Sequence, residues 1–278
     1  MKRRKLELAV ISDVHLGTFG CRAEEVLYYL KSIKPKKLIL NGDIIDFWQF
    51  KKKYWPGTHT KVLKEVLNLA SKGTEVYYLA GNHDKVLRRF VGYRLGKIKI
   101  ENKLVLNLNG EKAWFFHGDV FDVTMQYSRW LVRLGGVSYD FLIWLNYRVN
   151  RLIEFFGKDK ISFSKRIKNG VKGAVKYINK FEDTCAEIAI DQGYDYIVCG
   201  HIHQPEMRKI ITKNGSVTYL NSGDWIENLT SLEYNHGKWS LRKFDVKSEE
   251  FKDKTEADLN TKELFNKMLA EFNMEKAF

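Results

Sequence analysis

Five short groups of aspartate, histidine and asparagine residues follow apolar stretches of the sequence, and they contain five of the seven histidines. Imidazole and carboxylate groups are ligands of hard-to-borderline divalent cations such as Mn²⁺, Zn²⁺ and Fe²⁺, and no cysteine lies in the set. The pattern therefore predicts two adjacent divalent cations held at strand ends. The five groups are Asp13-Val14-His15, Gly42-Asp43-Ile44-Ile45-Asp46, Gly81-Asn82-His83-Asp84, His117-Gly118-Asp119 and Gly200-His201-Ile202-His203.

The spacing within the first and last groups suggests how pairs of side chains reach an ion. Side chains alternate between the two faces of a strand, so Asp13 and His15 are expected on one side. The same alternation lets His201 and His203 converge, on one ion or on different ions. Glycines lie beside Asp43, beside the asparagine of the third group and beside the first histidine of the fifth. They permit tight turns and a close approach of the backbone to a ligand or metal.

The apolar stretches before the first three groups have the length and composition of buried strands. These stretches are Leu6–Ser12, Lys37–Asn41 and Glu75–Ala80. Helical periodicity over Arg22–Ile33 and Thr58–Ser71 places a helix between successive strands. The alternation indicates an α/β sheet with its functional groups at the carboxyl ends of the strands.

The pattern changes after the third strand. The turn signal Asn109-Gly110 predicts a hairpin of Lys103–Leu108 with Lys112–His117. Met125 to about Gln192 is predicted to be mainly helical, so a helical insertion interrupts the α/β core. Strands are then expected at Tyr194–Cys199, Met207–Thr212, Ser216–Leu220, Leu229–Glu233 and Lys238–Phe244.

These elements predict one main domain over residues 1–246, interrupted by a helical cap insertion at about 124–192. A charged tail follows over residues 247–278, with a helix expected over Ala257–Phe272. The length of 278 residues and the 44% hydrophobic content suit a folded domain of this size and exclude a disordered chain.

Composition also bears on the compartment. The three cysteines, Cys21, Cys185 and Cys199, form no CxxC pair and fit a reducing cytoplasm. The basic start is followed by an apolar stretch shorter than the roughly 7–15 residues of a signal peptide, so a first strand is expected there. No run reaches the roughly 18 uninterrupted apolar residues of a membrane span. The sequence thus favours a soluble or peripheral protein.

The five groups, in this order across residues 13–203, resemble those of calcineurin-like metallophosphoesterases. The resemblance implies an α/β fold, a four-layer αββα sandwich of two packed sheets flanked by helices, with a dimetal site at one edge. It also implies the ligands: Asp43 would bridge two divalent ions, with Mn²⁺ as the first choice and Zn²⁺ or Fe²⁺ as alternatives. Asp13, His15 and His203 would hold the first ion, and Asn82, His117 and His201 the second.

The resemblance implies catalytic roles as well. His83 would protonate the leaving oxygen or stabilise the phosphoryl charge, and Asp46 would orient its ring. A neighbouring carboxylate fixes the tautomer of a histidine and favours its charged form, which suits this role. We further expect a supporting role for Asp119, and we expect Asp84 to cap the helix that follows it.

The basic charge helps to choose among phosphoesters. Lysine and arginine exceed the acids 47 to 34, a formal charge of +13 that suits nucleic acid, an anionic membrane or a phosphorylated substrate. The segment Met125–Lys180 holds twelve lysines and arginines against three acids, so it carries +9 of this charge, together with ten aromatic residues. A helical, aromatic cap rimmed with cations suits a ligand with acyl chains and phosphates, or docking on an anionic leaflet. Phe47-Trp48 also stands where protein serine/threonine phosphatases have Arg-Gly.

A helical insertion between the fourth and fifth groups is similar to that of UDP-2,3-diacylglucosamine hydrolases. These enzymes cleave a pyrophosphate, giving UMP and 2,3-diacylglucosamine 1-phosphate for lipid A biosynthesis. An Asn-x-x-Lys pair in their cap contacts the substrate, and Asn169 and Lys172 match it. His83 stands where that family has arginine. The resemblance implies a lipid-linked nucleotide as substrate and a place on the cytoplasmic face of the inner membrane.

Two other functions are weighed against this one. A phosphodiesterase or nuclease acting on nucleic acid or cyclic nucleotides would use the same metals and direct the cations at a phosphate backbone. The apolar cap and the lack of a nucleic-acid-binding module make it the second choice. A non-catalytic scaffold of this fold is expected to have lost metal ligands, and this sequence has the full set. We infer no protein partner.

Overall fold

The computed structural model of the chain describes residues 3–47, 54–122 and 171–245, with side chains in the last range described from residue 177 onward. These residues fall almost entirely in one unit, Met1–Lys243, which contains two β-sheets. Most of the predicted cap, residues 123–170, and the tail from residue 246 lie outside the described residues. The cap and the tail helix therefore stay predictions.

The first sheet has seven strands in the order β12-β11-β1-β2-β3-β5-β4. Strand β1 lies inside the sheet, where it pairs in parallel with β2 and antiparallel with β11. Strands β3 and β5 continue the parallel part of the sheet. The bounds are β1 Arg4–Ile11, β2 Ile33–Asn41, β3 Glu75–Leu79, β4 Arg94–Leu95, β5 Ile98–Glu101, β11 Thr230–Asn235 and β12 Lys238–Lys243.

The second sheet has five strands in the order β6-β7-β8-β10-β9. Strands β6 and β7 form the hairpin that the Asn109-Gly110 turn predicts, and β8 pairs in parallel with both β7 and β10. The bounds are β6 Lys103–Leu108, β7 Glu111–Phe116, β8 Tyr196–Cys199, β9 Glu206–Thr212 and β10 Gly215–Asn221.

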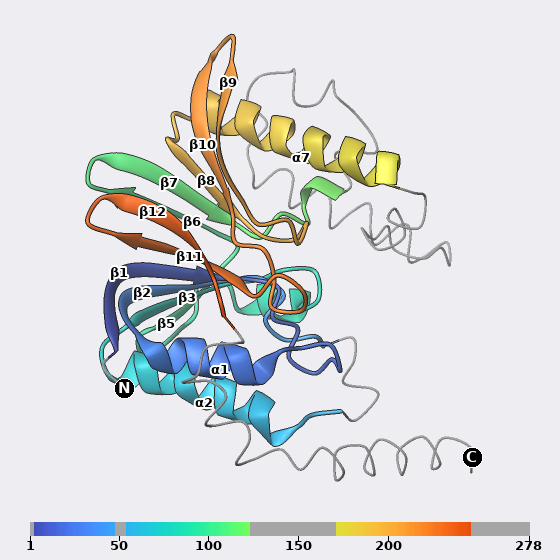
Figure 1. Ribbon diagram of the computed structural model, residues 1–278. Helices are drawn as coiled ribbons and strands as arrows, with labels where there is room; N and C mark the ends of the chain where they lie inside the picture. Colours follow the sequence, from blue (N-terminus) through green and yellow to red (C-terminus); the bar gives the residue numbers. More distant parts are fainter. Residues whose placement is uncertain (1–2, 48–53, 123–170, 246–278) are drawn as a thin grey trace. The chain divides into compact units, whose positions relative to one another are not determined.

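The two sheets pack face to face through alternate residues of their central strands. Leu8, Val10 and Ile39 of the first sheet share a buried cluster with Phe115 and Val198 of the second. Alternation along a strand sends the intervening residues to the opposite faces, where helices cover them. Figure 1 shows α1 and α2 on the outer side of the first sheet and α7 against the second. This arrangement confirms the α/β sandwich, with helical layers outside two packed sheets.

Each helix buries one apolar stripe. Helix α1, Ala23–Ser32, buries Val26 and Leu30 and has acidic residues in its first turn, which the helix dipole favours. Helix α2, Gly57–Ser71, buries Val62 and Leu69 in the same way. Both match the helices expected from periodicity.

Helix α7, Val171–Asp191, begins inside the predicted insertion. From Tyr177 onward it belongs to the layered core, because Phe181 and Cys185 pack with Trp114 and Phe116 of the second sheet. Among the helices of the described residues, none combines the length and the apolar character that crossing a bilayer requires.

Candidate metal centre

The carboxyl ends of β1, β2 and β3 in one sheet, and of β7 and β8 in the other, meet at one edge of the sandwich. Backbone hydrogen bonds join the loops that follow them: Asp13 N–H donates to the carbonyl of Gly42 at 3.0 Å, and His15 N–H to that of Asp43 at 2.9 Å. Within the second sheet Gly200 N–H donates to the carbonyl of His117 at 3.0 Å, and His201 N–H donates to Asp13 Oδ2 of the first sheet at 3.0 Å. The fold thus brings all five sequence groups to one place.

Five of the predicted ligands occupy left-handed backbone conformations. The φ angles are 53° at Asp13, 54° at His15, 53° at Asp43, 68° at His201 and 53° at His203. Such angles are uncommon outside glycine and cluster at functional sites. The expectation that strand alternation aligns these pairs is wrong, because β1 and β8 end before the first ligand of each pair. Left-handed turns bring the side chains together instead.

Two glycines of the groups are required by close packing. A Cβ on Gly81 would lie 2.2 Å from Asp43 Oδ1, and one on Gly200 would lie 2.5 Å from Asp13 Oδ2. Real Cβ atoms essentially never approach a heavy atom so closely. The carboxylates of Asp43 and Asp13 therefore lie directly against the backbone at these two glycines. A close approach of the backbone was the role expected for glycines beside the ligands.

Asp13, His15 and His203 form the first group of candidate ligands, with ligand atoms within 4.8 Å of one another. His203 Nε2 lies 3.2 Å and His15 Nε2 lies 4.0 Å from Asp13 Oδ1. Asp13 Oδ1 and His15 Nε2 are buried and make no hydrogen bond. Leaving buried polar atoms without hydrogen bonds is costly, and a divalent cation between these two would satisfy both.

Asp43, His117 and His201 form the second group. His117 Nε2 lies 3.3 Å from Asp43 Oδ2 and 3.3 Å from Asn82 Oδ1, so the asparagine of the third motif joins this group. The other ring nitrogen, Nδ1, lies 2.9 Å from the carbonyl oxygen of Asn41, which fixes the ring orientation. A backbone carbonyl holding the second nitrogen is typical of a metal-ligating histidine.

Asp43 is common to both sides of the centre. It lies in the group with His117 and His201 and also in a group with His15 and His83. His83 Nε2 is 4.0 Å from Asp43 Oδ2, and the His83 backbone N–H donates to Asp43 Oδ1 at 2.8 Å. A carboxylate in this position can be shared by two ions, so these residues fit a dinuclear site.

A family model for calcineurin-like phosphoesterases matches residues 6–205, which include all five groups. The chain belongs to the calcineurin-like phosphoesterase family. This family uses a dinuclear metal site, and the protein is a phosphoester or pyrophosphate hydrolase. The resemblance predicted from the sequence is thereby confirmed.

Curated relatives and solved structures share this likeness. A UDP-2,3-diacylglucosamine hydrolase of Aliivibrio fischeri (strain MJ11) is 25% identical over 249 residues, which are 87% of this chain and 100% of the relative. One from Vibrio cholerae serotype O1 (strain ATCC 39315 / El Tor Inaba N16961) is 27% identical over 81% of this chain and 93% of the relative. The solved structure of an archaeal phosphodiesterase aligns with a TM-score of 0.42 at 13% identity, over 85% of this chain and 98% of that chain.

Facing charges within the phosphoesterase centre shift the pKa values of its aspartates and histidines. Burial alone would raise the pKa of Asp13, but the facing imidazole of His203 lowers it to about 2. Burial alone would lower the pKa of His203, but the Asp13 carboxylate raises it to about 9. The pKa of His117 is likewise raised well above its usual value, against the effect of burial, by Asp43. These shifts favour the ionised form of Asp13 and the protonated forms of His203 and His117, whose protons a metal would displace.

One functional contact was missed by the sequence reasoning. Asp122 Oδ1 lies 2.9 Å from His201 Nε2, and Asp122 also accepts a hydrogen bond from the hydroxyl of Tyr177 on α7. A carboxylate on one ring nitrogen leaves the other for a metal and fixes the tautomer. The signal available in the sequence was an acid three residues after Asp119, on the turn that follows the fourth group.

Asp119 and Asp84 brace the loops of the phosphoesterase centre. Both Asp119 oxygens accept hydrogen bonds from Arg88 Nη2 at 2.9 Å, which agrees with the expected supporting role. The prediction that Asp84 caps the following helix is wrong, because its side chain makes no capping bond. It accepts instead from the backbone N–H groups of Gly81 at 2.6 Å and Ile44 at 2.9 Å. These bonds tie the loop after β3 to the loop after β2.

The two predicted substrate-binding residues lie where the structure does not describe side chains. Asn169 lies outside the described residues, and Lys172 lies in the first turn of α7, where side chains are not described. Their roles stay predictions.

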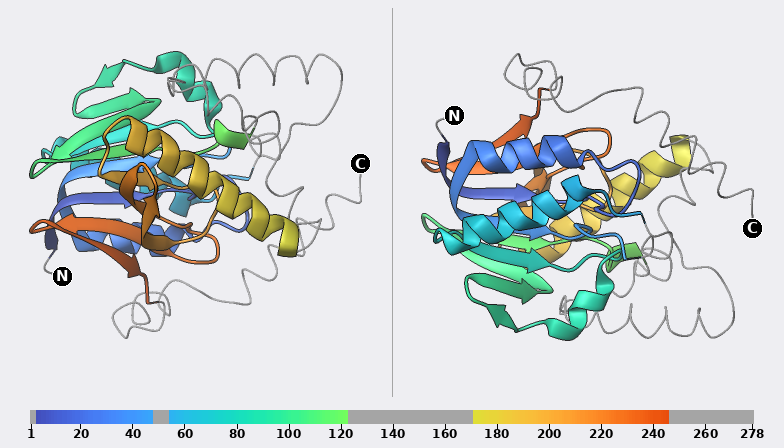
Figure 2. Two further views of the ribbon diagram at one scale, coloured as in Figure 1. Left: turned by 90° about the horizontal axis from the view of Figure 1, so that it is seen from above. Right: turned by 90° about the horizontal axis from the view of Figure 1, so that it is seen from below.

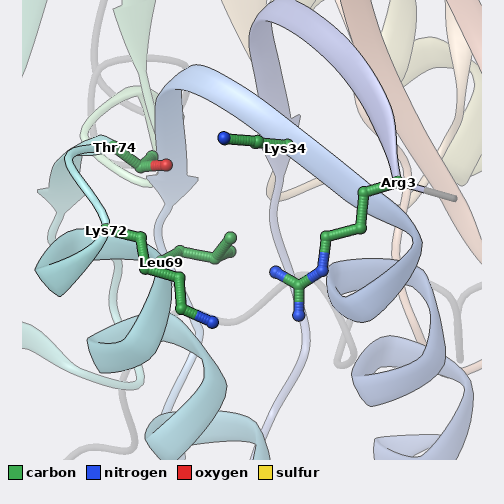
Figure 3. Close-up of a pocket in the computed structure, with 5 residues that line it drawn as sticks. All are labelled: Arg3, Lys34, Leu69, Lys72 and Thr74. Carbon is green, nitrogen blue, oxygen red and sulfur yellow. The ribbon is translucent and has the colours of Figure 1, made fainter.

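A separate hollow of about 240 Å³ opens where the first strands begin, at the end of the sheet away from the metal centre. Leu69 and Thr74 line it together with three cations, Arg3, Lys34 and Lys72, as Figure 3 shows. Arg3 pairs with Glu65 at 3.0 Å. Part of the net positive charge thus lies outside the predicted cap segment and away from the metal centre.

Proposed function

We propose that this phosphoesterase hydrolyses the pyrophosphate bond of UDP-2,3-diacylglucosamine or a related lipid-linked nucleotide, giving UMP and 2,3-diacylglucosamine 1-phosphate. The reaction type rests on Asp43, which lies within reach of two groups of ligands. The choice of substrate rests on relatives named UDP-2,3-diacylglucosamine hydrolase, which align over 81–87% of the chain. Two adjacent ions suit the in-line displacement of one phosphate oxygen by another.

The proposal assigns two divalent ions to the centre, with Mn²⁺ as the first choice and Zn²⁺ or Fe²⁺ as alternatives. The donor set of imidazoles, carboxylates and one amide supports this choice over softer metals. When bound, the ions supply the nucleophile and the positive charge that stabilises the phosphoryl oxygens. The proposed ligands are Asp13, His15 and His203 for one ion, Asn82, His117 and His201 for the other, and Asp43 for both.

His83 is the proposed general acid. Its Nδ1 lies 2.9 Å from Asp46 Oδ2, so the other nitrogen, Nε2, is directed toward the side of Asp43. Burial by itself lowers the pKa of His83, but the hydrogen bond with Asp46 and the charge of Asp43 outweigh it and raise the pKa. A protonated Nε2 can give its proton to the bridging oxygen as the bond to the α-phosphorus breaks, and diacylglucosamine 1-phosphate leaves.

The finer features of the proposal concern the lipid. Asn169 and Lys172 would contact the substrate from the cap, and the protein would act at the cytoplasmic face of the inner membrane. The basic, aromatic composition of residues 125–180 supports both points.

The proposal is tested by incubating the purified protein with Mn²⁺ and UDP-2,3-diacylglucosamine and measuring UMP by chromatography. We expect the parent protein to release UMP and the Asp43→Asn variant to release none. The control variant Asp191→Asn, changed at an exposed residue, should release UMP as the parent does. Parallel assays use a cyclic nucleotide and single-stranded DNA. Turnover of either without release of UMP would overturn the substrate in favour of the phosphodiesterase alternative. Unchanged activity and metal content in Asp43→Asn and His203→Ala would overturn the assignment of the centre.

A further inference from the structure

Exposed apolar side chains are concentrated in the segment that follows the third motif. Eight large apolar side chains are exposed in the described part of the chain, and four of them lie within ten residues. They are Val86, 37% exposed, Phe90, 47%, Tyr93, 67%, and Leu95, 73%. Single exposed apolar residues are ordinary, but a contiguous group of them marks an interaction site. We call residues 85–97 the 85–97 surface.

The backbone of this segment holds the apolar side chains together. The 3₁₀ helix η2 spans Lys85–Phe90 and is followed by β4, the outermost strand of the first sheet. Tyr93 N–H donates to the carbonyl of Phe90 at 3.0 Å, and the two rings lie 6.1 Å apart. Both views in Figure 2 show this teal segment at the margin of the fold. Leu95 of this edge strand is 73% exposed, so its side chain adds little to the packed core.

The charge of the segment is one-sided. Between Lys85 and Ile100 the sequence has six lysines and arginines and no acid. Four of these cations, Lys85, Arg89, Arg94 and Lys97, are exposed beside the apolar group. Aromatic and aliphatic side chains surrounded by cations match the boundary between headgroups and acyl chains of an anionic bilayer. A nucleic acid would match the cations but would offer nothing to Val86 and Leu95.

We propose that the 85–97 surface docks the protein on an anionic phospholipid bilayer. Phe90, Tyr93 and Leu95 enter the boundary of the acyl chains, while the exposed arginines and Lys97 contact the headgroups. The inference rests on the proposed function in one respect, since a lipid-linked substrate gives the enzyme its reason to be at a bilayer. The 85–97 surface would be a membrane contact in addition to the predicted cap, the segment that carries most of the net positive charge in the sequence.

Docking at this surface would also hold the metal centre close to the bilayer. The surface begins two residues after His83, and Arg88 fixes η2 to the loops of the centre. Its Nη2 donates to the carbonyl of Ala80 at 3.0 Å and to Asp119 at 2.9 Å. Because Asp119 follows His117 by two residues, the surface and the centre are parts of one hydrogen-bonded unit.

Sedimentation with vesicles tests the proposal on the full chain. The vesicles contain phosphatidylcholine alone or phosphatidylcholine with phosphatidylglycerol. We expect binding to the anionic vesicles only, and about a fivefold weakening for each cation removed in Arg89→Gln and Arg94→Gln. The variant Phe90→Ser/Tyr93→Ser/Leu95→Ser should lose most of its binding. Matched controls on β9 and its turn, Ile211→Ser and Lys209→Gln/Lys213→Gln, remove equally exposed groups and should bind like the parent.

Hydrolysis of bis(p-nitrophenyl) phosphate, a small soluble diester, shows whether each variant retains its fold and metal centre. Equal binding to neutral vesicles, equal losses in the β9 controls, or binding displaced by single-stranded DNA would each overturn the docking surface. Release of UMP from detergent-dispersed substrate tests the proposed function separately. Normal release by a variant that no longer binds vesicles supports both proposals, whereas vesicle binding without any release of UMP overturns the substrate and leaves the surface standing.

Discussion

The imidazole of His83 and the carboxylate of Asp46 lie 2.9 Å apart, from Nδ1 to Oδ2. The same Oδ2 lies 3.7 Å from Nδ1 of His15, a proposed metal ligand. Asp46 thus lies between the group proposed to bind metal and the group proposed to move a proton. The backbone N–H of Asp46 donates to the carbonyl of Leu16 at 2.8 Å, which fixes its position in the loop after β2.

Replacing His83 by asparagine is expected to lower kcat by about a hundredfold or more, since positioned general acids contribute on that order. The loss should be smaller for bis(p-nitrophenyl) phosphate, because p-nitrophenolate leaves without protonation. Steady-state kinetics on both substrates measure the difference. The exposed His236, replaced by asparagine in the same way, serves as the control and should keep full activity. Equal losses on the two substrates would contradict a proton-donating role.

Replacing Asp122 by asparagine should weaken binding of the second ion by roughly 10- to 100-fold, which is typical for the carboxylate partner of a ligating histidine. The reason is the contact of 2.9 Å with His201 Nε2, which sets the tautomer of that ring. Metal titration followed by elemental analysis measures the effect. Asp183→Asn on the exposed side of α7 is the matched control. If Asp122→Asn binds two ions with the parent's affinity, the positioning role is excluded.

The elements of the fold could be predicted from the sequence because their signals are strong. Buried strands such as β1 and β2 are short apolar runs bounded by turns, and α2 has a clear apolar stripe. Strands β4 and β5 were missed, since Arg94–Leu95 has two residues and Ile98–Glu101 mixes charged and apolar side chains. Strand β4 pairs with β5, and β5 takes its place in the sheet by pairing with β3, a tertiary interaction that no local pattern reveals.

That these side chains come together could also be predicted from the sequence, but the geometry of their arrangement could not. Asp13 and His203 are 190 positions apart, and only the order of motifs placed them together. Loops that are joined across the strand ends impose left-handed conformations at such residues. The alternation of side chains along a strand therefore does not describe how these ligands meet. Asp122 acts through its contact with His201, and that contact depends on the packing of the second sheet.

Replacing Gly81 by alanine should destabilise the protein by about 1–3 kcal/mol, the usual cost of forcing atoms into a packed site. The new Cβ would lie 2.2 Å from Asp43 Oδ1, so the carboxylate proposed to bridge the two ions would also move and metal affinity should fall. Urea unfolding and metal titration measure the two effects. Gly57→Ala at the start of α2 is the matched control, because nothing lies within 4 Å of its Cβ position. We expect that change to be neutral or slightly stabilising.

Metal binding should strengthen as the pH rises from about 6.5 to about 9. In the metal-free protein the pKa of His203 is raised from 6.5 to about 9, so its contribution to stability is complete below 6.5 and is lost as the pH rises through 9. The Asp13 contribution is complete above 3.8 and is lost as the pH falls through about 2. An ion must displace the His203 proton, so the metal-induced increase in Tm should grow across the upper range while the metal-free Tm declines. Thermal unfolding with Mn²⁺ and with EDTA measures both trends. An increase in Tm that does not depend on pH would show that His203 loses no proton on binding.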